Sequence, residues 1–181
     1  MPVVVLNADA DSFDAMAANR LEPEIYSLRS LHEFAAAVER YGEQRYPIHV
    51  KLDTGMHRLG FVEEELPALL DALARCGRTV RVASVFAHLC TSDDPAQDDF
   101  TRLQIARFDR MSSRIAEALP YPVLRHTANS AAIERFPEAQ YDMCRLGLGL
   151  YGFGFEHNAA LRPVSTLRTR IVQIKRLAPT E

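Results

Sequence analysis

The chain has 181 residues, of which 48% are hydrophobic and 25% charged, a balance that indicates a globular domain and excludes a fibrous or disordered chain. Its net charge of −3, with dispersed basic residues, predicts no nucleic-acid partner, and no apolar run is long enough to cross a membrane. Three cysteines without a CxxC spacing indicate neither a disulfide framework nor a metal site, so we expect a reducing, cytoplasmic setting.

Apolar runs alternate with amphipathic segments along most of the chain. Runs typical of strands begin near residues 3, 21, 48, 79, 121 and 142, and helical spacing is found at 9–19, 27–42, 63–77, 97–119 and 129–136. In the second helical segment, Ser30 is a candidate N-cap, with Glu33 completing a capping box. The alternation predicts an α/β fold in which helices cover a parallel sheet.

The pattern changes after residue 155. Residues 165–181 alternate polar and apolar side chains with period two, which is typical of an antiparallel, half-exposed strand. We therefore expect a barrel-like part at 1–157, then a linker and the start of a β-domain at 158–181. Six β-α units fit either an open doubly wound sheet or an eight-unit barrel whose first two strands are missing.

Polar residues and glycines gather where four predicted strands end. In parallel α/β folds ligands bind at this edge, and the four ends read KLDTGMHR, AHLCTSD, RHTANS and CRLGLG. Asn129 and Ser130 open a helix, where they can either bind a phosphate or cap the helix itself. Gly147 and Gly149 would let the backbone approach a ligand, or would serve packing and a turn.

For each of four basic side chains at the same edge, a structural role and a ligand-binding role are both possible interpretations. His88 and His126 are either buried core histidines or ligand contacts, and Arg58 either holds an anion or pairs with a carboxylate such as Asp53. Arg145 stands among apolar and glycine residues and keeps its charge in any protein. It therefore needs a partner, which can be an acidic neighbour or a ligand.

The four segments KLDTGMHRLGF, FAHLCTSDD, HTANSAA and CRLGLGLYG, in this order, resemble the bacterial alanine racemases, which are fold-type III pyridoxal-phosphate enzymes. The resemblance implies a partial (β/α)8 TIM barrel, about six of eight β-α units (strands 3 to 8), followed by the first strand of a β-domain. It also implies interconversion of L-alanine and D-alanine, which supplies D-alanine for peptidoglycan, in a cytoplasmic homodimer.

The resemblance assigns the phosphate of the cofactor to one group of residues. Ser130 resembles the side chain that binds the phosphate, the backbone N–H groups of Gly147 and Leu148 would contribute, and Asn129 lies beside them. Arg145 resembles the arginine that donates a hydrogen bond to the pyridine nitrogen of pyridoxal phosphate and leaves it unprotonated.

Four further residues take roles by the same resemblance. His88 resembles the imidazole that lies against the pyridine ring, and His126 resembles the residue bonded to the pyridine-binding arginine. Arg58 is similar to the arginine that contacts the phenolic oxygen of the cofactor and the carboxylate of the substrate. Lys51 resembles a lysine that many members carry in carbamylated form.

The catalytic acid and base of the family are not found in this chain. In the family they are the lysine that forms the Schiff base and a tyrosine of the partner subunit. The two lysines here are Lys51, which matches another role, and Lys175, which lies in the alternating segment. We therefore interpret the chain as a piece of an alanine racemase, inactive by itself, with no catalytic residue and no metal site.

Other functions remain open on the sequence. A pyridoxal-phosphate homeostasis protein shares the barrel, but has a GMSxD-like segment where this chain has RLGLGLYG. A related racemase of other specificity fits the same segments, whereas the decarboxylases of this fold place a glutamate where Arg145 stands. A phosphate-binding α/β domain unrelated to pyridoxal chemistry is the remaining alternative.

Overall fold

The computed structural model describes residues 1–155, 160–176 and 178. Its strands are β1 (Val4–Val5), β2 (Glu22–Ile25), β3 (Tyr46–Lys51), β4 (Val80–Phe86) and β5 (Leu124–His126). Its α-helices are α1 (Phe13–Ala18), α2 (Leu28–Arg40), α3 (Leu66–Arg75), α4 (Asp98–Ala118) and α5 (Ser130–Arg135). None of the helices in this described part of the chain combines the length and apolar character that crossing a membrane requires.

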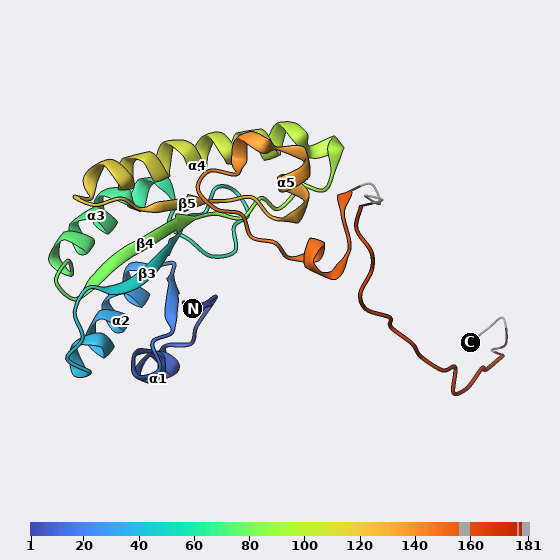
Figure 1. Ribbon diagram of the computed structural model, residues 1–181, viewed down its shortest axis with the longest axis horizontal. Coiled ribbons are helices and arrows are strands. Elements are labelled where there is room, and N and C mark those ends of the chain that lie inside the picture. Colours follow the sequence, from blue (N-terminus) through green and yellow to red (C-terminus); the bar gives the residue numbers. More distant parts are fainter. Residues whose placement is uncertain (156–159, 177, 179–181) are drawn as a thin grey trace.

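The five strands form one parallel sheet in the order β1-β2-β3-β4-β5. Figure 1 shows the sheet curving, with α1 to α4 arranged around its outer side. In the register of the central strands, Lys51 lies beside Phe86, which in turn lies beside His126. The parallel α/β fold predicted from the alternation is confirmed, and the ends of β3, β4 and β5 lie at one edge.

The main core lies between the sheet and its helices. Ile48 and Val50 of β3 are fully buried, as are Phe34 of α2, Leu69 of α3 and Phe108 of α4. Strand side chains alternate between the two faces of a sheet, so the apolar set of each strand meets the helices. This packing fixes the register of the strands and thereby sets which side chains face inward.

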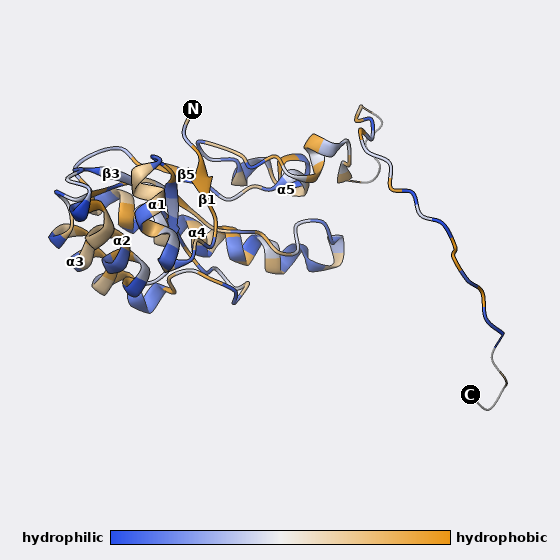
Figure 2. Cartoon of the chain, turned by 90° about the horizontal axis from the view of Figure 1, so that it is seen from below, coloured by the Kyte–Doolittle hydropathy of each residue, from blue (hydrophilic) through white to orange (hydrophobic). Residues whose placement is uncertain are grey.

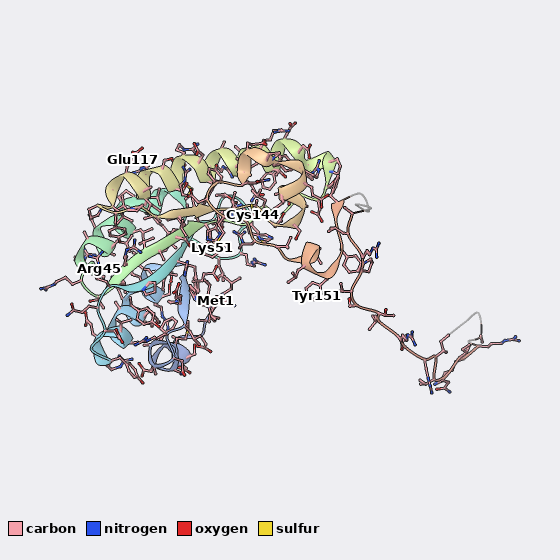
Figure 3. All side chains as sticks on the ribbon, in the orientation of Figure 1. Met1, Arg45, Lys51, Glu117, Cys144 and Tyr151 are labelled. Atoms are coloured by element: carbon pink, nitrogen blue, oxygen red, sulfur yellow. The ribbon has the colours of Figure 1, made fainter. Side chains whose placement is uncertain are left out.

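The inner face of the sheet is polar. Glu22 and Glu24 of β2 contact His49 and Lys51 of β3, and His49 contacts Ser84 of β4. These side chains occupy every second position of their strands, opposite to the apolar set. Figure 3 shows Lys51 near the middle of the molecule, among the strands.

The N-terminus of α2 is capped differently from the expectation. Ser27 is the N-cap and accepts a hydrogen bond from Ser30 N, while the Ser30 side chain completes the capping box. Glu33 instead pairs with Arg29 one turn away at 2.8 Å. The helix begins earlier because Ser27 still has the extended backbone of an N-cap, whereas Ser30 already lies inside the first turn.

The sixth strand expected near residue 142 is not formed. Asp142 N and Arg145 N each donate one hydrogen bond to the neighbouring segment, to Arg125 O and Ala128 O. Beyond them the chain turns into a 3₁₀ helix over Leu148–Tyr151, because the N–H groups of this glycine-rich stretch bond locally instead of continuing a ladder. The sheet therefore has five strands, not six.

The strand expected over residues 165–181 is not formed by the described residues 165–176, and residues 177 and 179–181 lie outside the description. In Figure 1 this segment runs away from the sheet, and Figure 2 shows the alternation of polar and apolar residues along it. Leu167 is 98% exposed and Val172 96% exposed. A half-buried strand needs a neighbouring strand and an apolar surface to cover it, and the described residues provide neither here.

Replacing Phe34 with alanine tests the packing of the sheet against α2. The Phe34 ring is fully buried and makes edge-to-face contacts with Phe13 and Tyr46, each at 5.3 Å between ring centroids. We expect Phe34→Ala to lower the free energy of unfolding in urea by about 3–5 kcal/mol. Leu103→Ala, on the exposed side of α4, is the control and should change it by less than about 0.5 kcal/mol. Equal losses in both variants would contradict this core.

Candidate functional site

A cavity of about 490 Å³ lies at the carboxyl ends of β3, β4 and β5. Its wall includes Lys51, Arg58, His88, Ser130 and Arg145, which are five of the sequence-predicted site residues. The others that line it are Asn129, Gly147 and Leu148. The structure thus gathers these residues from four separate segments into one place, as the parallel arrangement of the strands predicts.

His126 is the predicted site residue that does not line the cavity. It ends β5 and is 4% exposed, and its ring stacks on the Phe86 ring at 4.9 Å between centroids. It reaches the site through Arg145, whose Nη1 lies 2.8 Å from His126 Nδ1. His126 therefore contacts the cavity wall through this guanidinium and through the Phe86 ring.

Arg145 is held by backbone oxygens and one imidazole. Its Nη2 donates to Ala87 O at 2.7 Å and to Thr127 O at 3.2 Å. Its Nε–H makes no hydrogen bond within the described part of the chain, and Asp142, the acidic alternative, instead accepts from Arg125 N. Burial lowers the pKa of Arg145 to about 10, so the side chain remains a cation at neutral pH.

The Ser130 side chain lies where two backbone N–H groups converge. Its Oγ accepts from Gly147 N at 2.9 Å and from Gly149 N at 3.0 Å. A Cβ at Gly147 would make only an ordinary contact with this oxygen, at 3.8 Å, whereas a Cβ at Gly149 would lie 2.7 Å from Leu146 Cδ1 and force that side chain to move. Donors aimed at one point on a cavity wall are the arrangement that binds an anionic oxygen.

Asn129, in contrast, is occupied by structural bonds. Its Oδ1 accepts from Ala132 N and from Ser92 Oγ, and its Nδ2 donates to Leu89 O. Of the two residues that open α5, Asn129 is therefore the cap, and Ser130 keeps its side chain at the cavity. The side chain of Asn129 has little capacity left for a ligand.

Arg58 projects from a loop that follows β3. A bridge between Leu52 and Phe61 closes this loop, and Gly60 at its neck has φ +128°. A Cβ on Gly60 would lie 2.5 Å from Asp53 N, so the close approach of the two loop ends requires glycine. Asp53 bonds Gly55 N and His57 N, so it is not the partner of Arg58.

Lys51 forms a buried ion pair with Glu24. Its Nζ lies 3.3 Å from Glu24 Oε1, and the two side chains are 8% and 3% exposed. The same Nζ lies 4.5 Å from the centroid of the Phe86 ring. Burial lowers the pKa of Lys51, while the Glu24 carboxylate raises it again. Glu24 also accepts from Asn7 N at 2.6 Å, which fixes the carboxylate in place.

His88 lies in the cavity wall among cations. Burial lowers the pKa of His88 to about 4, and the charges of Arg145, Lys51 and Arg58 act in the same direction. Burial likewise lowers the pKa of His126 to about 3, again with Arg145 as the next cause. Both imidazoles are therefore neutral at pH 7, and a neutral ring can lie against a flat ligand without adding charge.

Sequence reasoning missed the inward residues Glu24, His49 and Ser84. Each lies in a segment whose apolar residues predict a strand, and this prediction does not single out the polar positions between them. The segments EPE and IHVK contain a signal for them, because polar residues occupy every second position, as expected of a strand with one polar face.

The described residues contain no cluster of histidine, cysteine or acidic side chains that could hold a metal.

Comparison with known proteins gives consistent matches. A family profile described as "Alanine racemase, N-terminal domain" matches residues 1–154. The alanine racemase of Nitratidesulfovibrio vulgaris is 40% identical over 151 residues, which cover 83% of this chain and 40% of that protein. The solved alanine racemase of Streptomyces coelicolor superposes with a TM-score of 0.82 at 24% identity, covering 91% of this chain and 45% of that one.

A further solved structure contains a cofactor. The alanine racemase of Bartonella henselae, with covalently bound pyridoxal phosphate, matches with a TM-score of 0.73 at 21% identity, covering 87% of this chain and 44% of that one. The chain spans 34%, 40% and 49% of the lengths of three curated relatives, which is half or less of each.

The two neutral histidines predict how stability depends on pH. Histidines of the unfolded chain bind protons below about pH 6.5, whereas His126 and His88 do so only near pH 3 and pH 4. Between pH 6.5 and 5 the unfolded state therefore binds more protons, and acid lowers the free energy of unfolding. Each histidine contributes a slope of up to about 1.4 kcal/mol per pH unit.

Urea titrations between pH 6.5 and 5 measure this slope. We expect His126→Gln to reduce it, because the substituted side chain does not titrate. His32→Gln, on the exposed face of α2, is the matched control. A slope that is the same in the two variants would contradict a neutral, buried His126.

Proposed function

The chain belongs to the family of alanine racemase N-terminal domains, and on this premise we propose that it forms the cofactor-binding wall of an alanine racemase. That isomerase interconverts L-alanine and D-alanine with pyridoxal phosphate. The observation that carries the proposal is the position of Ser130 and Arg145 on one cavity, with two backbone donors converging beside Ser130.

The phosphate end of the cofactor fits at Ser130. The N–H groups of Gly147 and Gly149 donate to Ser130 Oγ, which leaves the serine O–H to donate to an anionic oxygen, and a bound phosphate oxygen would take the place of Oγ as the acceptor of these N–H groups. Leu148, which lies between these glycines, lines the same cavity and can add its N–H. Asn129 supports this end indirectly, by capping α5 and holding the 89–92 segment through Leu89 and Ser92.

The ring end fits at Arg145 and His88. The Nε–H of Arg145 is the donor left over after the other guanidinium bonds, so it can serve the ring nitrogen. Because the guanidinium keeps its proton, it holds that nitrogen unprotonated. Neutral His88 borders the same space. When bound, pyridoxal phosphate supplies the electron-withdrawing ring that makes the α-proton of the amino acid acidic.

Arg58 is the candidate group for the carboxylate of alanine. It is exposed at the rim of the cavity, and it also lines a neighbouring cavity of about 440 Å³ together with Lys51 and Glu24. A guanidinium at an open rim can bind a carboxylate through two parallel hydrogen bonds. This orients the amino acid before any proton moves.

The groups that move the proton are proposed to belong to the rest of the enzyme. Lys51 is tied to Glu24, Lys175 lies in the exposed C-terminal segment, and no tyrosine of the described residues lines the cavity. The relatives are at least twice as long as the matched part, so they contain further residues that can complete a site. On this proposal the chain by itself binds the cofactor but does not racemise alanine.

The arrangement of the whole protein is also a proposal. We propose a division into a barrel part at 1–157 and the beginning of a β-domain at 158–181, a dimeric enzyme, and a cytoplasmic supply of D-alanine for peptidoglycan. The exposed apolar side chains of one short segment support a covering partner or domain, since apolar surface gathered in one place marks an interaction site; they are Leu146, Leu148, Leu150, Tyr151 and Phe153.

Titration with pyridoxal phosphate tests the proposed binding wall. We expect the chain to shift the absorption spectrum of the cofactor, and Ser130→Ala to weaken binding by roughly 10- to 100-fold, the value of one hydrogen bond to a charged group. Pyridoxal, which lacks the phosphate, should bind the two proteins equally.

Ser113→Ala on α4 is the matched control and should bind like the unchanged chain. After borohydride reduction, no cofactor should remain attached to Lys51 or Lys175. Equal loss of pyridoxal and pyridoxal phosphate binding in Ser130→Ala, or a reduced adduct on either lysine, would be evidence against this assignment.

A second test concerns whether Lys51 is an ammonium or a carbamate. We propose that it stays an ammonium, because the Glu24 carboxylate at 3.3 Å stabilises a cation and would repel a carbamate anion. In the presence of ¹³C-bicarbonate, the unchanged chain should give no carbamate NMR signal. Glu24→Gln should give one, since the lysine loses its anionic partner while Arg145 and Arg58 remain.

Glu22→Gln is the matched control for this test. Glu22 lies on the same strand but bonds His49 instead of Lys51, so its substitution should leave Lys51 unmodified. A carbamate on Lys51 of the unchanged chain would show that Glu24 does not prevent carbamylation of this lysine.

A further inference from the structure

An unbroken line of hydrogen bonds crosses the inner face of the sheet and ends at Arg145. Glu22 Oε2 lies 2.7 Å from His49 Nε2, and His49 Nδ1 lies 2.6 Å from Ser84 Oγ. Ser84 Oγ lies 3.0 Å from His126 Nε2, and His126 Nδ1 lies 2.8 Å from Arg145 Nη1. The first three steps each pass to the next strand, from β2 through β3 and β4 to β5, and the last reaches Arg145 in the segment that follows α5.

The direction of this line follows from its two ends. Arg145 has donors only, so His126 Nδ1 must accept and the proton of the neutral ring must sit on Nε2. His126 Nε2–H then donates to Ser84 Oγ. Ser84 is fully buried, and among the described residues His49 Nδ1 is the one remaining acceptor within reach of its hydroxyl proton, so the Ser84 hydroxyl donates to His49 Nδ1. The proton of His49 therefore sits on Nε2 and is donated to Glu22, whose carboxylate only accepts.

We propose that Ser84 and His49 are positioning residues for Arg145, which fix His126 as the Nε2–H tautomer through this one-directional line. With the other tautomer, two donors would face each other between His126 and Arg145, and a buried polar contact would be lost. His49, Ser84 and His126 are 7%, 0% and 4% exposed, so water does not substitute for a missing partner.

The same hydrogen bonds fix the orientation of the Arg145 guanidinium. Nη1 of Arg145 is bonded to His126, while Nη2 is bonded to Ala87 O and Thr127 O, so both outer nitrogens have fixed directions. The plane of the group, and with it the Nε–H, is then fixed as well. That this Nε–H serves the cofactor ring rests on the proposed function, whereas the direction of the line does not.

Nitrogen-15 NMR of the histidine rings tests the line in the cofactor-free chain. His49→Gln and His126→Gln identify the two sets of signals. At neutral pH we expect both rings to carry one proton, on Nε2, and to have an unprotonated Nδ1. A proton on Nδ1 of His126, or a doubly protonated His126, overturns the proposal without any further variant.

Ser84→Ala removes the middle of the line without adding bulk. We expect it to shift the ring signals of both His126 and His49, to speed the exchange of the His126 Nε2 proton, and to weaken pyridoxal phosphate binding roughly twofold to tenfold, the value of one neutral hydrogen bond. Ser112→Ala is the matched control, since Ser112 is equally buried but bonds Arg125. Unchanged histidine signals in Ser84→Ala also overturn the proposal.

The two proposals fail in different ways. The expected tautomers in a chain that does not bind pyridoxal phosphate would support the line and refute the proposed function. Binding of pyridoxal phosphate by a chain whose His126 carries its proton on Nδ1 would support the function and refute the line.

Discussion

The site depends on a half-buried guanidinium that keeps its proton at neutral pH. Arg145 lies at the end of the sheet, beside the Phe86 ring, and its charge is accommodated by three backbone carbonyls and one neutral imidazole. No carboxylate contacts it directly in the described residues. Dipoles instead of a counter-ion surround the charge, so the remaining donor of the side chain is free to serve a ligand.

Among the described residues, Glu24 is the carboxylate that forms an ion pair with one of the three cations of the site, Lys51, Arg58 and Arg145. It contacts Lys51 directly and raises the pKa of both Lys51 and Arg145 through its field. Without it, Lys51 would be a buried cation with no carboxylate in contact with it among the described residues. The carboxylate is itself fixed by Asn7 N, so the N-terminal segment takes part in the electrostatics of the site.

Much of the site could be predicted because its residues are adjacent in sequence to recognisable strand ends. Ser130 follows β5 directly, and His88 follows β4, so any parallel sheet brings them together. The strand predicted from the apolar stretch at 142–150 is not formed in the structure. There the hydrogen bonds of Gly147 and Gly149 to Ser130 Oγ outweigh the strand pattern, and these bonds exist only once α5 is in place.

The alternation of strands and helices, the edge of the sheet where the candidate site lies, and the need of Arg145 for a partner could all be predicted from the sequence, because they follow from local periodicity and from the chemistry of single residues. The folded chain was needed to show that Glu24 is the partner of Lys51, that Ser84 connects His49 with His126, and that Asn129 instead of Ser130 caps α5. The physical reason is register. Pairing of β2, β3, β4 and β5 brings residues that are 27 to 42 positions apart within 3.0 Å, as in the contacts of Glu22 with His49 and of Ser84 with His126, and no local pattern encodes that distance.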